Sequence, residues 1–340
     1  MKTSEIPSRI YDQLLEPHKA QPAQVVAGSG LSSAEVFRCV AGEQPLCLRC
    51  WPAEHPSRER LQLIHAAMQQ LTLAGISITP KLFFTRSGDS FCFDGQRYWE
   101  LTSWLPGAAS YATHPSEVKL DAAMTALADI HQAWFRANQS PSSKLNTSPT
   151  VSERVTRLAN WLRQIDRLRP TQRCEPGIEW SLANATCDAL RRLGPKLLAD
   201  LEILRVQPVG LHFSLRDIWS EHVLFSGDTV SGVIDFGALR VDEPLTDIVR
   251  LIGSLEPVDV AKREFAINAY ENRRQGYYVV DRARLAVLAQ TATLLSAVQW
   301  MQWLIIERRT FKVPHAQLVD RWSRFVNALA SHTSYSNRNI

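Results

Sequence analysis

The alternation of apolar and polar positions predicts a β-rich first third of the chain. Strands are predicted over residues 24–26, 35–40, 46–51, 81–85, 90–93 and 98–105. One helix is predicted among them, over 57–74, because its apolar residues recur three or four positions apart. Ser57 suits its N-cap and Gly75 its C-terminal end. Residues 24–105 are therefore expected to form a small antiparallel sheet with one helix.

Helical spacing dominates after Pro106-Gly107. Helices are predicted over 116–136, 151–168, 179–204, 245–255, 258–275, 281–309 and 315–331. The helix over 179–204 is expected to break at Gly194-Pro195, because proline lacks the amide that an interior helical position donates. One β-hairpin interrupts this half, with strands over 223–225 and 230–234 joined by Ser226-Gly227-Asp228.

The predicted elements divide the chain of 340 residues into four segments. The fold class is α+β, with a small β-rich lobe and a larger, mainly helical lobe that contains the hairpin. The expected boundaries are an N-terminal extension at 1–23, an N-lobe at 24–105, a C-lobe at 106–332 and a flexible tail at 333–340.

Composition narrows the choice of compartment and partners. The net charge of +4 is mild and the basic residues form no run, so a nucleic-acid partner is not expected. The N-terminus shows no apolar signal region, and no apolar stretch has membrane-spanning length. The six cysteines do not make a disulfide scaffold in a chain this long. A cytoplasmic protein without a membrane partner is predicted, and the oligomeric state stays open.

Two aspartates flank the hairpin. Asp217 follows Leu215-Arg216, and Asp235 precedes Phe236-Gly237. Phosphoryl transfer needs a carboxylate that orients and deprotonates the attacking hydroxyl, a carboxylate that holds Mg²⁺, and a cation on the phosphates. The two aspartates on loops around one hairpin, after a β-rich lobe with a Gly-Ser-Gly loop, favour that chemistry.

The segment LRDIWSEHVLF, residues 215–225, resembles the catalytic loop of the protein-kinase-like superfamily. Within it, the segment is most similar to the aminoglycoside phosphotransferase and choline kinase group, whose pattern is roughly H-[GR]-D-x-x-x-x-N, an apolar strand, and an acidic residue before Phe-Gly. VSGVIDFG at 230–237 and DEPLTDI at 242–248 extend the similarity. The resemblance implies a protein-kinase-like two-lobed fold, with a nucleotide-binding N-lobe and a C-lobe for catalysis and acceptor binding.

The resemblance also implies site roles. Asp217 would be the catalytic base and Asp235 the main Mg²⁺ ligand, with ATP as phosphoryl donor and Mn²⁺ as an alternative metal. Asp247 is expected to cap a helix or to hold the catalytic-loop backbone. The other residues implied to bind nucleotide cover the phosphates (Gly28, Ser29, Gly30, Ser32), neutralise them (Arg49), or bind adenine through the backbone (Ser103, Leu105).

Several positions depart from the family pattern. His222 stands at the asparagine that serves as second metal ligand; it would ligate a metal, hydrogen-bond to the Asp217 loop, or fill space. Arg49 replaces the phosphate-binding lysine; the alternative is an outward-facing strand residue. His65 occupies the helical position where a glutamate would pair with that cation, and Glu59 lies nearly two turns earlier.

Two functions remain open at this stage. The first is a small-molecule kinase that transfers the γ-phosphate of ATP to a hydroxyl of an aminoglycoside, choline-like alcohol, sugar or amino alcohol. Residues 106–200 are not notably acidic, which lowers the expectation of a cationic aminoglycoside. The second is a pseudokinase-like protein that binds nucleotide or ligand without turnover. A protein kinase is disfavoured, because no activation segment separates Gly237 from the next predicted helix.

Overall fold

The computed structural model describes residues 6, 10, 13–14, 21–26, 34–137, 146–165, 177–274, 278–311 and 313–336. Close contacts between residues group the chain into two compact units. Unit 1 comprises Met1–Ala137 and Ser220–Arg240, and unit 2 comprises Asn138–Trp219 and Val241–Ile340. Unit 1 therefore contains the first helix after residue 106 and the β-hairpin, both of which the sequence analysis places with the helical lobe.

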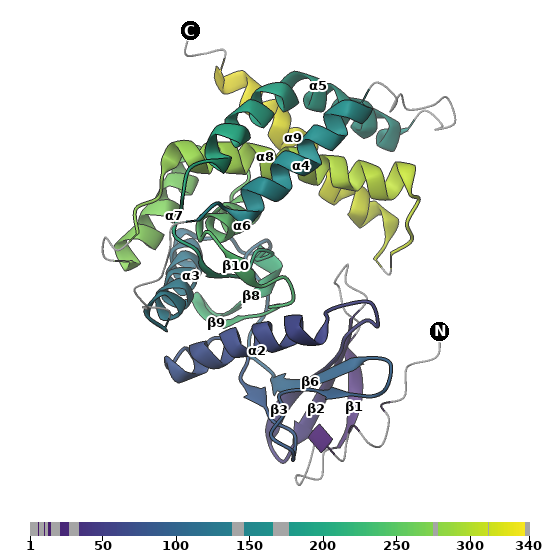
Figure 1. Cartoon of the computed structure of the whole chain (residues 1–340), viewed down its shortest axis with the longest axis vertical. Helices are drawn as coiled ribbons and strands as arrows, with labels where there is room; N and C mark the ends of the chain where they lie inside the picture. Colours follow the sequence, from purple (N-terminus) through teal and green to yellow (C-terminus); the bar gives the residue numbers. More distant parts are fainter. Residues whose placement is uncertain are drawn as a thin grey trace. The chain divides into compact units, whose positions relative to one another are not determined.

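Unit 1 holds the antiparallel sheet that the sequence pattern predicts (Figure 1). Its strand order is β1-β2-β3-β6-β4, and β5 pairs with β6. The strands are β1 (Gln21–Val26), β2 (Glu35–Ala41), β3 (Gln44–Cys50), β4 (Leu82–Phe83), β5 (Cys92–Phe93) and β6 (Tyr98–Ser103). β1 begins inside the segment expected as an N-terminal extension. The order places β3 beside β6, although about fifty residues separate them in sequence.

The helix α2 (Arg58–Leu73) belongs to the same unit as this sheet, and it begins where the sequence predicts. Ser57 caps it by accepting a hydrogen bond from the Arg60 amide, and Gly75 follows with φ +78°. The predicted apolar stripe is buried, together with His65. Within the sheet, Phe37 stacks on Trp99 with ring centroids 6.0 Å apart, which anchors its core.

Unit 1 also contains α3 (Glu117–Ala137), the 3₁₀ turn η1 (Ser220–His222), and the hairpin of β8 (Val223–Ser226) and β9 (Thr229–Val233). The predicted hairpin is confirmed, and Gly227 supplies the positive φ of its turn. Phe225 and Ala108 exchange two backbone hydrogen bonds of 2.8 and 3.0 Å. This bridge fixes the hairpin to the segment that follows β6, so the residues after β9 belong to the same unit as β3.

Unit 2 is mainly helical, and Figure 1 shows α4, α5, α8 and α9 packed side by side. Its helices are α4 (Pro149–Gln164), α5 (Ile178–Arg205), α6 (Leu245–Leu255), α7 (Val260–Arg273), α8 (Arg282–Met301), the π-helical η2 (Gln302–Ile306) and α9 (His315–Ser336). A two-stranded sheet pairs β7 (His212–Ser214) with β10 (Arg240–Asp242). The bounds of α6 agree with those predicted.

Two predictions on helix ends are wrong. α5 continues through Gly194-Pro195 instead of breaking there. Gly194 lacks the Cβ that would crowd the Pro195 ring, and a Cβ there would lie 2.8 Å from Leu162 Cδ2. The packing of α5 against α4 and α8 offsets the hydrogen bond that Pro195 cannot donate. α9 reaches Ser336, inside the expected tail of 333–340, because extending a formed helix costs far less than nucleating one. None of the helices in the described ranges has the length and apolar character needed to cross a membrane.

Candidate functional site

Asp235 lies just after β9, in unit 1, and its backbone is in the left-handed region with φ +66°. Aspartate tolerates this conformation better than most residues, and such positions cluster at functional sites. The carboxylate Oδ1 accepts hydrogen bonds of 3.3 Å from the Gly237 amide and from Arg49 Nη1. His222 Nε2 lies 3.8 Å from Oδ2. Burial would raise the pKa of Asp235, but the charges of Arg49 and His222 outweigh it and hold the pKa below its ordinary value.

Arg49 is held between two carboxylates of unit 1. Its Nε lies 3.7 Å from Glu100 Oε1, and its Nη1 donates to Asp235. β3 and β6 are paired with Arg49 opposite Glu100, so the two side chains leave the same face of the sheet. The guanidinium also lies over the Trp51 ring, 4.9 Å from its centroid. Arg49 is thus directed at Asp235, and the alternative of an outward-facing strand residue is excluded.

Glu100 is buried, and one oxygen of its carboxylate accepts two hydrogen bonds. Oε2 accepts from Trp51 Nε1 at 2.9 Å and from His65 Nε2 at 2.7 Å. His65 is buried on α2, and its Nδ1 lies 2.7 Å from Ser90 Oγ. Burial would raise the pKa of Glu100, but these donors and the Arg49 charge keep it below its ordinary value. His65, at the expected glutamate position, therefore holds a glutamate that comes from the sheet.

Asp217 lies in unit 2, on the loop after β7, and its side chain is about half exposed. Oδ1 accepts hydrogen bonds from Trp219 Nε1 at 2.7 Å and from Arg250 Nη2 at 2.7 Å and Nε at 3.2 Å. Arg250 is on α6, three residues after Asp247. These donors fix the orientation of the carboxylate from one side.

The loop that carries Asp217 is fixed by buried acids. Asp247 accepts from the amides of Leu215 at 2.7 Å and Arg216 at 2.6 Å, which confirms that it holds the loop backbone. Burial raises its pKa to about 7. Arg216 has φ +64°, and its side chain pairs with Glu153 and with Asp242, whose Oδ2 lies 3.2 Å from Arg216 Nε. Positive φ at both Arg216 and Asp235 marks the two loops that the sequence analysis singles out.

Comparison with known proteins assigns this chain to a family. The model of the phosphotransferase enzyme family matches residues 24–288. The chain belongs to the phosphotransferase enzyme family. No curated protein sequence matches it significantly.

Solved structures confirm the kinase-like fold of this phosphotransferase-family chain. A spectinomycin phosphotransferase, APH(9)-Ia, in complex with ADP and spectinomycin is similar over 95% of this chain and 96% of its own, with 12% identity and a TM-score of 0.69. An aminoglycoside phosphotransferase from Alicyclobacillus acidocaldarius covers 98% and 95%, with 14% identity and a TM-score of 0.65. A thermostable mutant of APH(4)-Ia with AMP-PNP and hygromycin B covers 91% and 95%, with 15% identity and a TM-score of 0.54.

The remaining nucleotide-binding residues expected in this family member divide into two groups. Gly28, Ser29, Gly30 and Ser32 lie outside the described residues. The Ser103 amide donates to Lys81 O at 2.9 Å, and its hydroxyl accepts from the Lys81 amide. The Ser103 amide is therefore engaged in backbone pairing, and adenine binding by the backbone around Ser103 and half-buried Leu105 stays a prediction.

Metal binding in this family member would rest on few protein ligands. Within the described ranges, no group of three or more histidine, cysteine or acidic side chains is placed to hold a metal ion. Mg²⁺ commonly takes only one or two carboxylates and leaves the rest to phosphates and water. Asp235 alone fits that arrangement, and the nearby His222 nitrogen suits Mn²⁺ better than Mg²⁺.

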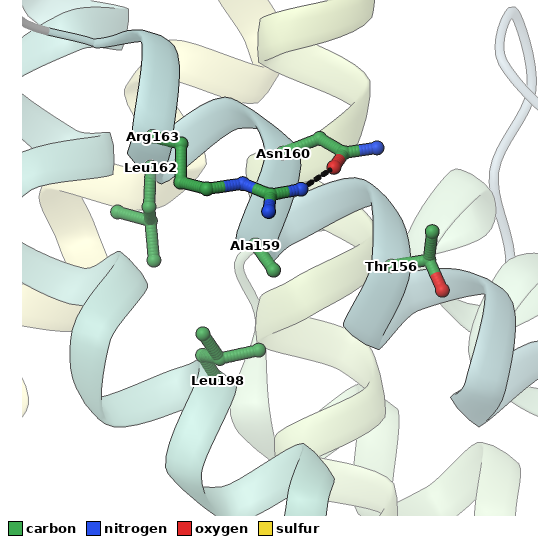
Figure 2. A pocket seen from close by; sticks show the side chains of 6 residues that line it. All are labelled: Thr156, Ala159, Asn160, Leu162, Arg163 and Leu198. Carbon is green, nitrogen blue, oxygen red and sulfur yellow. Dashed lines mark hydrogen bonds between the residues drawn. The ribbon is translucent and has the colours of Figure 1, made fainter.

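A surface pocket of about 490 Å³ lies between α4 and α5 (Figure 2). Its lining residues are Thr156, Ala159, Asn160, Leu162, Arg163 and Leu198. Figure 2 shows the Arg163 guanidinium hydrogen-bonded to Asn160 along α4. None of the site residues predicted from the sequence lines this pocket, so we assign it no part in phosphoryl transfer.

Sequence reasoning missed Glu100 and Arg250. Glu100 stands in a strand between Trp99 and Leu101, and a charged residue within a buried apolar run is a signal for a paired buried carboxylate. Arg250 had no comparable signal, because an arginine on a helix three residues after an aspartate is commonly solvent-exposed.

Proposed function

We propose that the chain transfers the γ-phosphate of ATP to a hydroxyl of a small molecule. The observation that carries the proposal is the hydrogen bond between Arg49 and Asp235, which lie 186 residues apart in sequence. It brings together, within unit 1, the cation and the carboxylate that phosphoryl transfer needs on the nucleotide phosphates.

In this proposal the residues have separate roles. Arg49 neutralises phosphate oxygens, and Asp235 provides a carboxylate oxygen for a divalent cation, which supplies charge stabilisation when it is bound. Asp217 orients the acceptor hydroxyl and takes its proton. The hydroxyl oxygen forms a bond to the γ-phosphorus, the bond to the β–γ bridging oxygen breaks, and ADP leaves. Trp219 and Arg250 hold Asp217 Oδ1 and thereby orient the carboxylate that acts on the hydroxyl.

A second candidate is a protein that binds nucleotide without turnover. His222 at the asparagine position favours it, because imidazole nitrogen is a poor Mg²⁺ ligand. The retained Asp217 and Asp235 favour the kinase.

A thermal-shift experiment tests the proposal. ATP with Mg²⁺ or Mn²⁺ should raise the unfolding midpoint of the wild type, and Asp235→Asn should reduce that rise. Absence of any nucleotide-dependent shift in the wild type would sink both candidates. Turnover of ATP across a panel of alcohols then separates the kinase from the binding protein.

A further inference from the structure

Arg250 lies beside Asp217 in unit 2. Arg250 donates two hydrogen bonds to Asp217 Oδ1, and its guanidinium lies over the Trp219 ring, 4.2 Å from the centroid. Trp219 meets the Phe325 ring edge-on, with centroids 6.2 Å apart. This stack keeps the Arg250 charge next to the carboxylate proposed to act on the acceptor hydroxyl.

Two further arginines, Arg154 and Arg157, lie three residues apart on α4 and therefore share one face of that helix. Arg154 donates to the Leu288 carbonyl and the Thr291 hydroxyl. Arg157 is exposed and donates to Gln299 Oε1 at 2.9 Å. These hydrogen-bond acceptors are all uncharged.

Each of the two α4 arginines is also destabilised in its charged form. Burial, and after it repulsion by Arg250, together lower the pKa of Arg154 to about 10. Although the Arg157 side chain is exposed, partial desolvation by the atoms around it and the Arg250 charge lower its pKa in the same direction. The three guanidinium groups therefore repel one another across a small region of unit 2.

The carboxylates of this region already have partners. Glu153 and Asp242 pair with Arg216, and Asp242 also accepts from Thr150 Oγ1 at 2.6 Å. Glu243 forms a buried ion pair with Arg284 at 2.7 Å. Of the three arginines, Arg250 donates to a carboxylate, that of Asp217, whereas Arg154 and Arg157 donate to the uncharged groups named above. Clustered, partly desolvated arginines are typical of sites that bind oxyanions, because guanidinium matches carboxylate and phosphate oxygens in forked geometry.

We propose that the cluster of Arg154, Arg157 and Arg250 binds an anionic oxygen group, carboxylate or phosphate, on the acceptor. This inference rests on the proposed function, because only a phosphotransferase has an acceptor. A cationic substrate such as an aminoglycoside would be repelled at the same place. The acceptor class is therefore a small hydroxy compound with an anionic substituent near the hydroxyl that receives the phosphate.

ATP turnover on four matched acceptors tests the substrate class: glycerate, glycerol 3-phosphate, glycerol and 2-amino-1,3-propanediol. One or both anionic acceptors should exceed glycerol and the cationic amine in kcat/KM by about tenfold or more. Arg157→Gln should remove about that factor for the anionic acceptors and leave glycerol unchanged. Arg163→Gln, on the same helix, is the matched control and should change neither. Preference for the neutral or cationic acceptor would overturn the inference while leaving the kinase function standing.

Direct binding separates the two proposals. Calorimetric titration with glycerate and with inorganic phosphate, without nucleotide and at constant ionic strength, should give an affinity that Arg157→Gln weakens about tenfold. Arg49→Met and Arg163→Gln should retain it, which excludes binding at the nucleotide residues of unit 1 and a general charge effect. Comparison of the two ligands tells a carboxylate site from a phosphate site. Anion binding without ATP turnover would sink the kinase and keep the anion site. Equal affinity in wild type and Arg157→Gln, or binding of neither anion, would overturn the anion site.

Discussion

Arg49 on β3 and Glu100 on β6 occupy paired positions of neighbouring strands, and the counter-charge of the cation at the candidate site comes from the sheet itself. The glutamate is buried and its pKa lies below the ordinary 4.5. A carboxylate whose pKa falls on folding stabilises the fold above its unfolded pKa, and this contribution is lost as pH falls through the folded pKa.

Glu100→Gln should therefore change the acid limb of stability. The wild type is expected to lose stability as the pH falls below about 4.5, whereas the variant should start lower and show a flatter profile there. Denaturant unfolding at a series of pH values measures this difference. Glu54→Gln, at an exposed position, is the control and should follow the wild type. Parallel curves for wild type and Glu100→Gln would contradict a charged Glu100 in the fold.

Arg49 should affect nucleotide affinity through both charge and geometry. Arg49→Met is expected to weaken ATP binding by about tenfold, because charge-assisted contacts to phosphate are lost. Arg49→Lys should recover only part of this, since an ammonium cannot contact Glu100 and Asp235 with a fork. Titration with ATP measures the affinity, and Arg38→Met, at an exposed position of β2, serves as control. Unchanged affinity in Arg49→Met would remove Arg49 from the nucleotide site.

Asp217→Asn should separate binding from chemistry. An amide cannot take the acceptor proton, so turnover should fall by about 10²–10⁴-fold, while the nucleotide-dependent thermal shift should persist. Initial rates and thermal shifts on the same preparation check both statements. Full turnover in the variant would show that another group acts on the hydroxyl.

Gly107 is expected to be intolerant of a side chain. It has φ +94°, and an added Cβ would lie 2.2 Å from Ser231 Oγ and 2.6 Å from the Phe225 carbonyl oxygen. Gly107→Ala should cost about 3 kcal/mol of unfolding free energy, from the left-handed backbone and the clash together.

Gly88→Ala separates these two contributions. Gly88 has φ +86°, but no heavy atom lies within 4 Å of an added Cβ. Gly88→Ala should lower the free energy of unfolding by about 1 kcal/mol, from backbone strain alone. Equal losses in the two variants, measured by denaturant unfolding, would argue against the close approach of Gly107 to the hairpin.

Local patterns in the sequence predicted much of the fold. The stripe of α2, the bounds of α6 and the hairpin around Gly227 follow from periodicity and turn chemistry. The break predicted at Pro195 was wrong, because the proline costs the helix one hydrogen bond and the packing of α5 against α4 and α8, which the sequence does not show, outweighs that cost.

The contacts within the candidate site were harder to predict from the sequence, because strand register and long-range packing determine them. The contact between Arg49 and Glu100 depends on which residue of β6 lies opposite β3. Arg250 reaches Asp217 across 33 residues, from a helix whose orientation the sequence does not give. Asp217, Asp235 and Arg49 were predicted from the motif pattern, and Glu100 and Arg250, which contact Arg49 and Asp217, were not.

The origin of Glu100 in the sheet has a consequence for control of the protein. Because Arg49 and Glu100 lie on hydrogen-bonded neighbouring strands, a rigid displacement of α2 would break the contact between His65 and Glu100 but leave the two opposite charges together. A conformational change that moves α2 alone would therefore leave Arg49 paired with Glu100. We expect Arg49 to keep its counter-charge permanently, with regulation, where it exists, acting on other parts of the chain.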